Sequence, residues 1–113
     1  WPDRLSDVAP RLDWTHAQAW TFEPLDEDAF PAIRLMRDAV AASALHPAVY
    51  NAANEECVRA FVDGELPFLG IVDTARSVVE AYDAPAEVTL DGVDHAESWA
   101  RERAARAIAA ARG

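Results

Sequence analysis

The chain has 113 residues, of which 51% are apolar, and a formal net charge of −10 from 20 acidic and 10 basic residues. This length allows one domain of ordinary size, and the apolar content excludes a disordered chain. The acidic balance argues against binding to nucleic acid or an anionic membrane surface, and no apolar run approaches the ~18 residues of a membrane-spanning helix.

Several chemistries lack the residues that they need in this sequence. All ten basic residues are arginines, and the absence of lysine excludes a Schiff-base enzyme or a P-loop phosphate site within the chain. The four glycines form no G-x-G-x-x-G cradle for a nucleotide. The single cysteine and the three histidines show no zinc-ligand spacing. Composition alone therefore does not identify a function.

Cys57 is the only cysteine of the chain, so no intrachain disulfide can form. This usage fits a reducing cytosol, and we expect a cytoplasmic protein. Cys57 also lies among apolar positions of an expected helix, which favours a buried small hydrophobic residue over a reactive nucleophile.

The first quarter of the chain, residues 1–26, contains three of the four tryptophans and three of the seven prolines. This composition predicts an irregular segment with one short strand at Ala19–Glu23. Trp20 and Phe22 would then lie on one face of the strand. Pro24 would end it, because proline cannot donate a hydrogen bond to a ladder.

Four aromatic side chains in this quarter need a surface to pack on: Trp1, Trp14, Trp20 and Phe22. Either they fold back on the helices as part of the core, or they pack on a part of the protein outside this chain. The first residue is tryptophan rather than methionine, and we therefore expect a piece of a longer polypeptide. The sequence leaves both packing alternatives open.

A helical period begins after the acidic residues 26–28, which suit the positive end of a helix dipole. Apolar side chains then recur at spacings of three and four and form one stripe. The stripe comprises Phe30, Ile33, Met36 or Arg37, and Val40. This first helix should end near Ser43.

A second helix follows, and its start has two candidates. Pro47 suits a first helical turn, whereas Asn51 could cap a helix that begins one turn later. Gly64 stands where a left-handed residue would end the helix. The segment Pro67–Gly70 then predicts a break.

The third helix has the clearest apolar period, from Ile71 to Tyr82. A short extended bridge is expected at residues 88–90, before a fourth helix capped by Asp91 or Asp94. Four helices with short connections predict a mainly α fold, namely a small antiparallel four-helix bundle preceded by an irregular segment with one short strand.

The string Asn51-Ala-Ala-Asn54-Glu55 is the most distinctive motif. Two asparagines inside a helical pattern lower helix propensity, so some interaction should offset that cost. The alternatives are capping, a buried hydrogen bond to a neighbouring loop, or a ligand, and we rank them in that order. Intrahelical ion pairs at i, i+4 spacing are expected for Glu55–Arg59, Glu97–Arg101 and Glu102–Arg106.

The densest acidic clusters are residues 26–28 and 55–56. Carboxylates are the ligands of hard divalent cations, but we interpret both clusters as solvated helix surface.

At the asparagine string the sequence resembles the carboxy-terminal part of the 1-deoxy-D-xylulose 5-phosphate reductoisomerase family. The resemblance covers essentially the whole chain in the same order. It rests on Ala48-Val-Tyr-Asn-Ala-Ala-Asn-Glu55, Ala60-Phe61, Gly64 and Phe68, and on the segments Trp1-Pro2, Leu12-Asp13, Thr21-Phe-Glu-Pro24, Phe30-Pro31-Ala32 and Trp99-Ala-Arg-Glu-Arg103.

The resemblance implies a whole enzyme that makes 2-C-methyl-D-erythritol 4-phosphate in non-mevalonate isoprenoid synthesis and is the target of fosmidomycin. Such an enzyme uses NADPH and a divalent metal, Mg or Mn, and is expected to be a homodimer. The family's catalytic, cofactor-binding and metal-binding residues lie outside this segment. We therefore expect none of them in this chain, and we expect the chain alone to be structural and inactive.

The resemblance also implies a division of the chain. Residues 1–26 would be the tail of the central catalytic domain and a linker, and residues 27–113 the carboxy-terminal helical domain. The missing nucleotide-binding and catalytic domains would be the partners. Trp1, Trp14, Trp20 and Phe22 would contact those domains, while the asparagine string would serve capping or interdomain contact. The alternative is a self-standing helical protein-interaction module.

Overall fold

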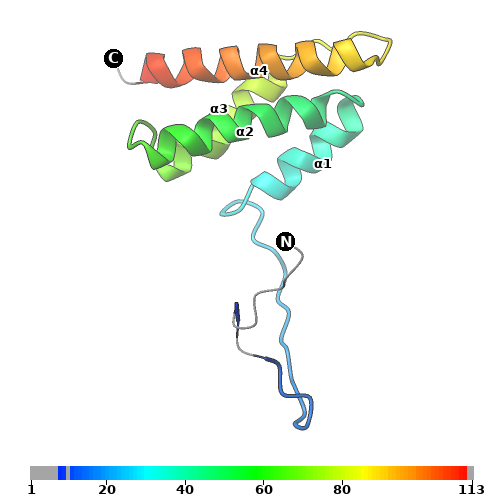
Figure 1. Cartoon of the computed structure of the whole chain (residues 1–113), viewed down its shortest axis with the longest axis vertical. Coiled ribbons are helices and arrows are strands. Elements are labelled where there is room, and N and C mark those ends of the chain that lie inside the picture. The colour runs from blue at the N-terminus through cyan, green and yellow to red at the C-terminus, as the bar shows by residue number, and fades with distance from the viewer. Residues whose placement is uncertain (1–7, 10, 112–113) are drawn as a thin grey trace.

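The structure is a computed structural model, and it describes residues 8–9 and 11–111. It contains four helices, in the order α1 (Ala32–Ala42), α2 (His46–Val62), α3 (Phe68–Glu80) and α4 (Leu90–Ala111). The helices pack into a bundle, and the segment before α1 extends away from it as an arm (Figure 1). The predicted four-helix bundle is confirmed. No helix of the described residues is long and apolar enough to cross a membrane.

The core lies around α2, which contacts each of the other three helices, whereas α1 and α4 do not contact each other. The most extensive contact joins α2 to α4, and both helices present small side chains to the other elements. Nearly half of the buried apolar residues are alanines, and no polar side chain is buried among the described residues. Helices whose facing residues are this small can approach closely along their length.

The apolar stripe predicted for α1 exists, but most of it does not face the core. The buried residues of α1 are Leu35 and Ala39, whereas Phe30 just before the helix, Ile33 and Val40 are exposed. Helix α1 therefore has two apolar sides, of which only one is covered by α2 and α3.

Helix α2 begins at His46, so of the two predicted starts Pro47 is the confirmed one. The hydroxyl of Ser43 accepts hydrogen bonds from the backbone N–H groups of Leu45 and His46, at 3.2 and 3.3 Å, which satisfies donors at the helix start. Gly64 has a φ of +75°, as expected for a left-handed residue directly after a helix.

The predicted break at residues 67–70 is wrong for all but Pro67, because α3 begins at Phe68. Pro67 itself is extended, with ψ of 155°, and precedes the first helical residue. Gly70 is needed inside the first turn for another reason: a Cβ there would lie 2.9 Å from Cδ1 of the buried Leu66. The glycine lets a loop side chain pack against the helix.

Helix α4 begins earlier than predicted, because its cap is Thr89, two residues before Asp91 and five before Asp94. The hydroxyl of Thr89 accepts a hydrogen bond from the backbone N–H of Gly92 at 3.0 Å, and it therefore caps the helix. Asp91 and Asp94, the predicted caps, lie within the first two turns, and Leu90 belongs to the helix rather than to an extended bridge.

The predicted short strand at residues 19–23 is wrong, since the described residues contain no strand. The segment is not helical, but its backbone has no hydrogen-bonded neighbour in the part of the chain that the structure describes. A strand exists only through its ladder, so an unpaired segment is not one. The rings of Trp20 and Phe22 still lie on one side and stack, with centroids 6.4 Å apart.

Candidate functional site

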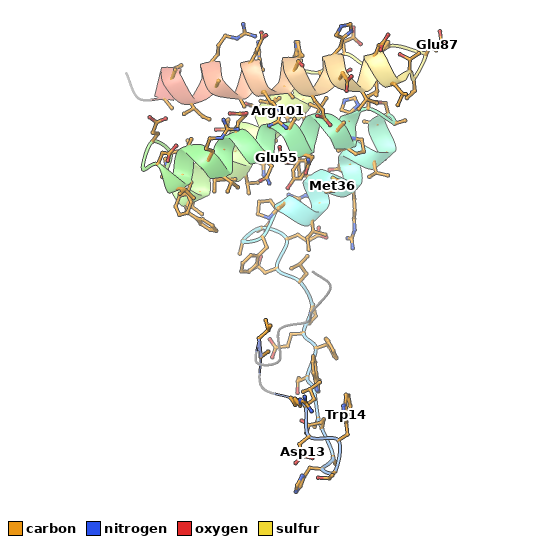
Figure 2. The ribbon with its side chains drawn as sticks, viewed as in Figure 1. Asp13, Trp14, Met36, Glu55, Glu87 and Arg101 are labelled. Atoms are coloured by element: carbon orange, nitrogen blue, oxygen red, sulfur yellow. The ribbon has the colours of Figure 1, made fainter. Side chains whose placement is uncertain are left out.

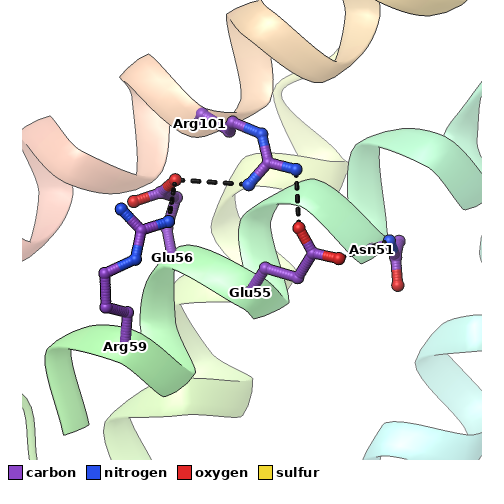
Figure 3. A network of polar contacts seen from close by, with 5 residues as sticks. All are labelled: Asn51, Glu55, Glu56, Arg59 and Arg101. Carbon is purple, nitrogen blue, oxygen red and sulfur yellow. Dashed lines mark hydrogen bonds and ion pairs between the residues drawn. The ribbon is translucent and has the colours of Figure 1, made fainter. Parts of the chain in front are cut away.

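A polar network joins α4 to α2 across the bundle (Figure 3). The guanidinium of Arg101 donates to Glu55 Oε2 at 2.6 Å through Nη2 and to Glu56 Oε1 at 3.3 Å through Nη1. Arg59 Nη2 donates to the same Glu56 oxygen at 2.8 Å. Asn51 Nδ2 donates to Glu55 Oε1 at 3.1 Å. Arg101 thus bridges two adjacent carboxylates, and each of these also accepts a hydrogen bond from another side chain of α2.

The network shifts the protonation of its members. The hydrogen bond from Arg101 lowers the pKa of Glu55 below its ordinary value, and the positive charge of Arg101 and the hydrogen bond from Asn51 act in the same direction. The hydrogen bond to Glu55 raises the pKa of Arg101. Both side chains remain partly exposed to solvent, so the network fixes the geometry between the helices more than it contributes to stability.

The asparagine string is partly explained by this arrangement. Asn51 lies in the second turn of α2 and does not cap it, and its bond to Glu55 is an i, i+4 side-chain pair on the helix surface. Asn54 is half-buried and has no side-chain hydrogen bond within the described residues. Two members of the string therefore belong to the network, and Asn54 does not.

Of the three ion pairs predicted within helices, Glu102–Arg106 is confirmed, at 3.8 Å, and the other two are replaced by different pairs. Arg101 turns away from Glu97 to α2, and Arg59 pairs with Glu56 rather than with Glu55. The partners of Arg101 lie 45 and 46 residues away in the sequence, so no local spacing could have revealed them.

Replacing Arg101 by glutamine is expected to destabilise the protein at neutral pH and to have less effect in acid. Because the folded-state pKa of Glu55 is lowered, its contribution is fully present above the ordinary glutamate pKa of about 4.3 and is lost as pH falls through the lowered value. Urea unfolding at neutral pH and below pH ~4 measures this difference.

The matched control is Arg106→Gln, because Arg106 forms a longer and more exposed pair with Glu102, at 3.8 Å. This variant should be close to the parent at both pH values. An Arg101→Gln penalty that stays constant with pH would contradict the assigned role of Glu55.

The aromatic arm is the second candidate site. Trp14, Trp20 and Phe22 are all exposed, Trp20 by 72% and Phe22 by 84%, so the alternative that they fold back on the bundle is wrong for these three. Trp1 lies outside the described residues. Figure 2 shows Trp14 beside Asp13 at the far end of the arm.

A local turn shapes the end of the arm. One carboxylate oxygen of Asp13 accepts hydrogen bonds from the backbone N–H and the hydroxyl of Thr15, at 2.9 and 2.6 Å. The other lies 2.9 Å from Nδ1 of His16. The hydrogen bond from the Thr15 hydroxyl is the main cause that lowers the pKa of Asp13. The turn is therefore set by side chains of the arm alone.

Two hollows on the surface form the third candidate site, and both are lined mainly by apolar side chains. The first, of about 510 Å³, lies between the residues that lead into α1 and the start of α3. The second, of about 490 Å³, lies along α1 beside Tyr50. They share Ala32 and Ile33, so they form one continuous surface. We call this surface the outer face; its apolar members are Leu25, Phe30, Ile33, Met36, Val40, Tyr50, Phe68, Leu69 and Val72.

The described residues contain no group of three or more histidine, cysteine, aspartate or glutamate side chains that could hold a metal ion. Cys57 is buried as predicted, and burial raises the pKa of its thiol to about 11, which leaves no reactive thiolate at neutral pH.

Comparison with known proteins places the chain in one family. The family model for the DXP reductoisomerase C-terminal domain matches residues 1–103. The chain is 54% identical over 107 residues to a 1-deoxy-D-xylulose 5-phosphate reductoisomerase of Kitasatospora griseola and 52% identical over 111 residues to one of Beutenbergia cavernae. These matches cover 92% and 96% of the chain but only 28% of each relative.

A solved structure agrees with these sequence matches. The reductoisomerase of Zymomonas mobilis in complex with NADPH superposes with a TM-score of 0.78 at 33% identity, over 96% of this chain and 29% of that one. The chain thus spans somewhat more than a quarter of the proteins that it matches.

Proposed function

This chain belongs to the 1-deoxy-D-xylulose 5-phosphate reductoisomerase family as its carboxy-terminal domain, and we propose that the whole protein performs the reaction for which the family is named. That protein would convert 1-deoxy-D-xylulose 5-phosphate to 2-C-methyl-D-erythritol 4-phosphate with NADPH and Mg or Mn. The match of residues 1–103 to the family model carries the proposal. It favours a domain of an enzyme over a self-standing helical interaction module.

Within the whole protein, this chain would have a structural role. Its described residues offer no metal-binding cluster, and its sequence has neither lysine nor a glycine-rich nucleotide loop. Residues outside the chain would then hold the NADPH, the metal and the substrate phosphate. The helical bundle would support the catalytic domain and help to frame its cleft.

The proposed division places the tail of the central domain and a linker at residues 1–26 and the carboxy-terminal helical domain at residues 27–113. The exposure of Trp14, Trp20 and Phe22 supports contact between the arm and a domain outside the chain. In the whole protein, the unpaired backbone of residues 19–23 would join a neighbouring strand. The same contact would cover Trp1. A separate contact from α2 to another domain would involve Asn51, Asn54 and Glu55.

Two further properties belong to the same proposal. The whole protein would be a homodimer, and it would work in the cytoplasm, consistent with a single cysteine that is buried and unpaired.

The reaction can be tested by comparing the whole polypeptide with the 113-residue chain. We expect the whole polypeptide to oxidise NADPH when 1-deoxy-D-xylulose 5-phosphate and Mg²⁺ are present, and to lose this activity when a chelator removes the metal. The chain alone should show no turnover and no saturable binding of NADPH, because it lacks the groups that hold the nucleotide. Absorbance of NADPH and a fluorescence titration measure the two properties.

Circular dichroism of the chain provides the control, since a helical spectrum shows that the lack of binding is not caused by unfolding. Saturable micromolar binding of NADPH to the helical chain would contradict the structural role. An inactive whole polypeptide would contradict the proposed reaction.

A further inference from the structure

The outer face is unusual because most of its large apolar side chains are exposed, whereas Met36, Tyr50 and Val72 pack partly against the core. Phe30, Ile33, Phe68 and Leu69 are all exposed, although each lines the first hollow. Large contiguous apolar surfaces on a protein mark places where another surface packs. We therefore expect another protein surface to cover the outer face.

The geometry of α1 separates this surface from the core of the bundle. Leu35 and Ala39 already bury the inner side of the helix against α2 and α3. Within the stripe only Met36 packs against that core, whereas Phe30, Ile33 and Val40 are exposed. A second apolar side on a short helix is explained by a second packing partner.

The opposite side of the bundle has a different character. The exposed side chains of α4 include Glu102, Arg103 and Arg106, and two of these pair with each other. None of the described hollows beside α4 is lined mainly by large aliphatic side chains. The bundle thus has a solvated side at α4 and an apolar side at α1 and α3.

The position of the arm identifies the occupant. Leu25, at the base of the arm, lines the first hollow, so the chain leaves the bundle at the outer face itself (Figure 1). The chain matches a carboxy-terminal domain model and covers about 28% of each relative. In the whole protein proposed above, the remaining polypeptide would be tethered through this arm. The tether would keep that polypeptide at a high effective concentration next to the outer face.

The charge of the first hollow adds a requirement on the occupant. Asp28 and Asp73 also line it, and Asp28 has no ion pair within the described residues. An apolar segment that carries a basic side chain would fill the hollow and pair with a carboxylate at its edge.

We propose that the outer face is the docking surface for the preceding catalytic part of the same polypeptide, which inserts an apolar segment with a basic side chain between α1 and α3. The inference rests on the proposed function, because it requires that the chain is a domain of that larger protein. It adds a second contact to the one proposed for the arm, and together they fix the orientation of the bundle.

Hydroxyl-radical footprinting of the whole polypeptide tests the docking directly. Leu69 lines the first hollow and Leu90 lines none of the described hollows, yet they are 76% and 86% exposed in this structure. Two leucines of such similar exposure should be oxidised at similar rates if the face is free. We expect Leu69 to be oxidised several-fold more slowly than Leu90, independently of protein concentration. Equal rates would overturn the proposal, and protection of Leu69 that grows with concentration would assign the face to a second copy.

A pair of variants separates docking from folding. Leu69→Asp and Leu90→Asp each place an acid in the first turn of a helix, where the helix dipole favours it. Leu69→Asp should restore the oxidation of Phe68 and Phe30 in the whole polypeptide, and Leu90→Asp should not. If Leu69→Asp leaves both phenylalanines protected, the docking is wrong.

The turnover of the unmodified polypeptide keeps the two proposals apart. An active polypeptide whose Leu69 is oxidised as fast as Leu90 contradicts the docking alone. An inactive polypeptide contradicts the proposed reaction, whatever the footprint shows.

Discussion

Replacing Leu45 by alanine is expected to lower the free energy of unfolding by about 2–5 kcal/mol. Leu45 is 1% exposed and is among the largest fully buried side chains, although it lies in the short connection between α1 and α2. Its removal leaves a cavity that the surrounding helices can fill only in part. The loss is a large share of the roughly 5–15 kcal/mol that stabilises a typical domain.

Thermal or urea unfolding of the chain measures this loss. Leu90→Ala is the control, because Leu90 is exposed and its truncation removes little buried surface. Equal losses for the two variants would show that Leu45 is not buried as the structure has it.

The second large effect is expected from Ala100→Leu, at about 1–3 kcal/mol of destabilisation. Ala100 is fully buried on α4, which packs most extensively against α2, whose buried residues include Ala52 and Ala53. A leucine has no space between helices that approach this closely, so it must force α4 away from α2 or adopt a strained rotamer. The contact through Arg101 would be disturbed in either case.

Ala105→Leu on the same helix is the matched control, because Ala105 is exposed and the added side chain can extend into solvent. Chemical denaturation should place this variant close to the parent. If Ala100→Leu proved equally neutral, the close packing of α2 and α4 would be contradicted.

Much of the helical structure could be predicted from local sequence. The period from Ile71 to Tyr82 gave the main part of α3, and Ser43 and Gly64 marked the ends of α1 and α2. These signals are short-range, because periodicity and helix ends depend on residues within a few positions. The resemblance to a known family, carried by the asparagine string, supplied the functional interpretation and is confirmed by the comparisons.

What could not be predicted depends on distant contacts. Leu45 and Leu66 are buried outside any helix, so no periodicity marks them as core. The stripe on α1 has the spacing of a core-facing side, and only the positions of α2 and α3 show that it points outward. The partners of Arg101 are set by how α4 lies along α2. The strand predicted at residues 19–23 was wrong for a related reason, since no described residue forms a ladder with that segment.

The central position of α2 has a consequence for how the bundle opens. Helix α1 touches only α2 and α3 and buries two side chains of its own, whereas α2 touches every other helix and buries five. Local unfolding costs the least free energy where the fewest buried contacts are lost, so α1 should detach first and α2 last. Detachment of α1 would release the arm and the outer face together. The weakest part of the bundle is therefore the part that, in the proposed assembly, a neighbouring domain would hold in place.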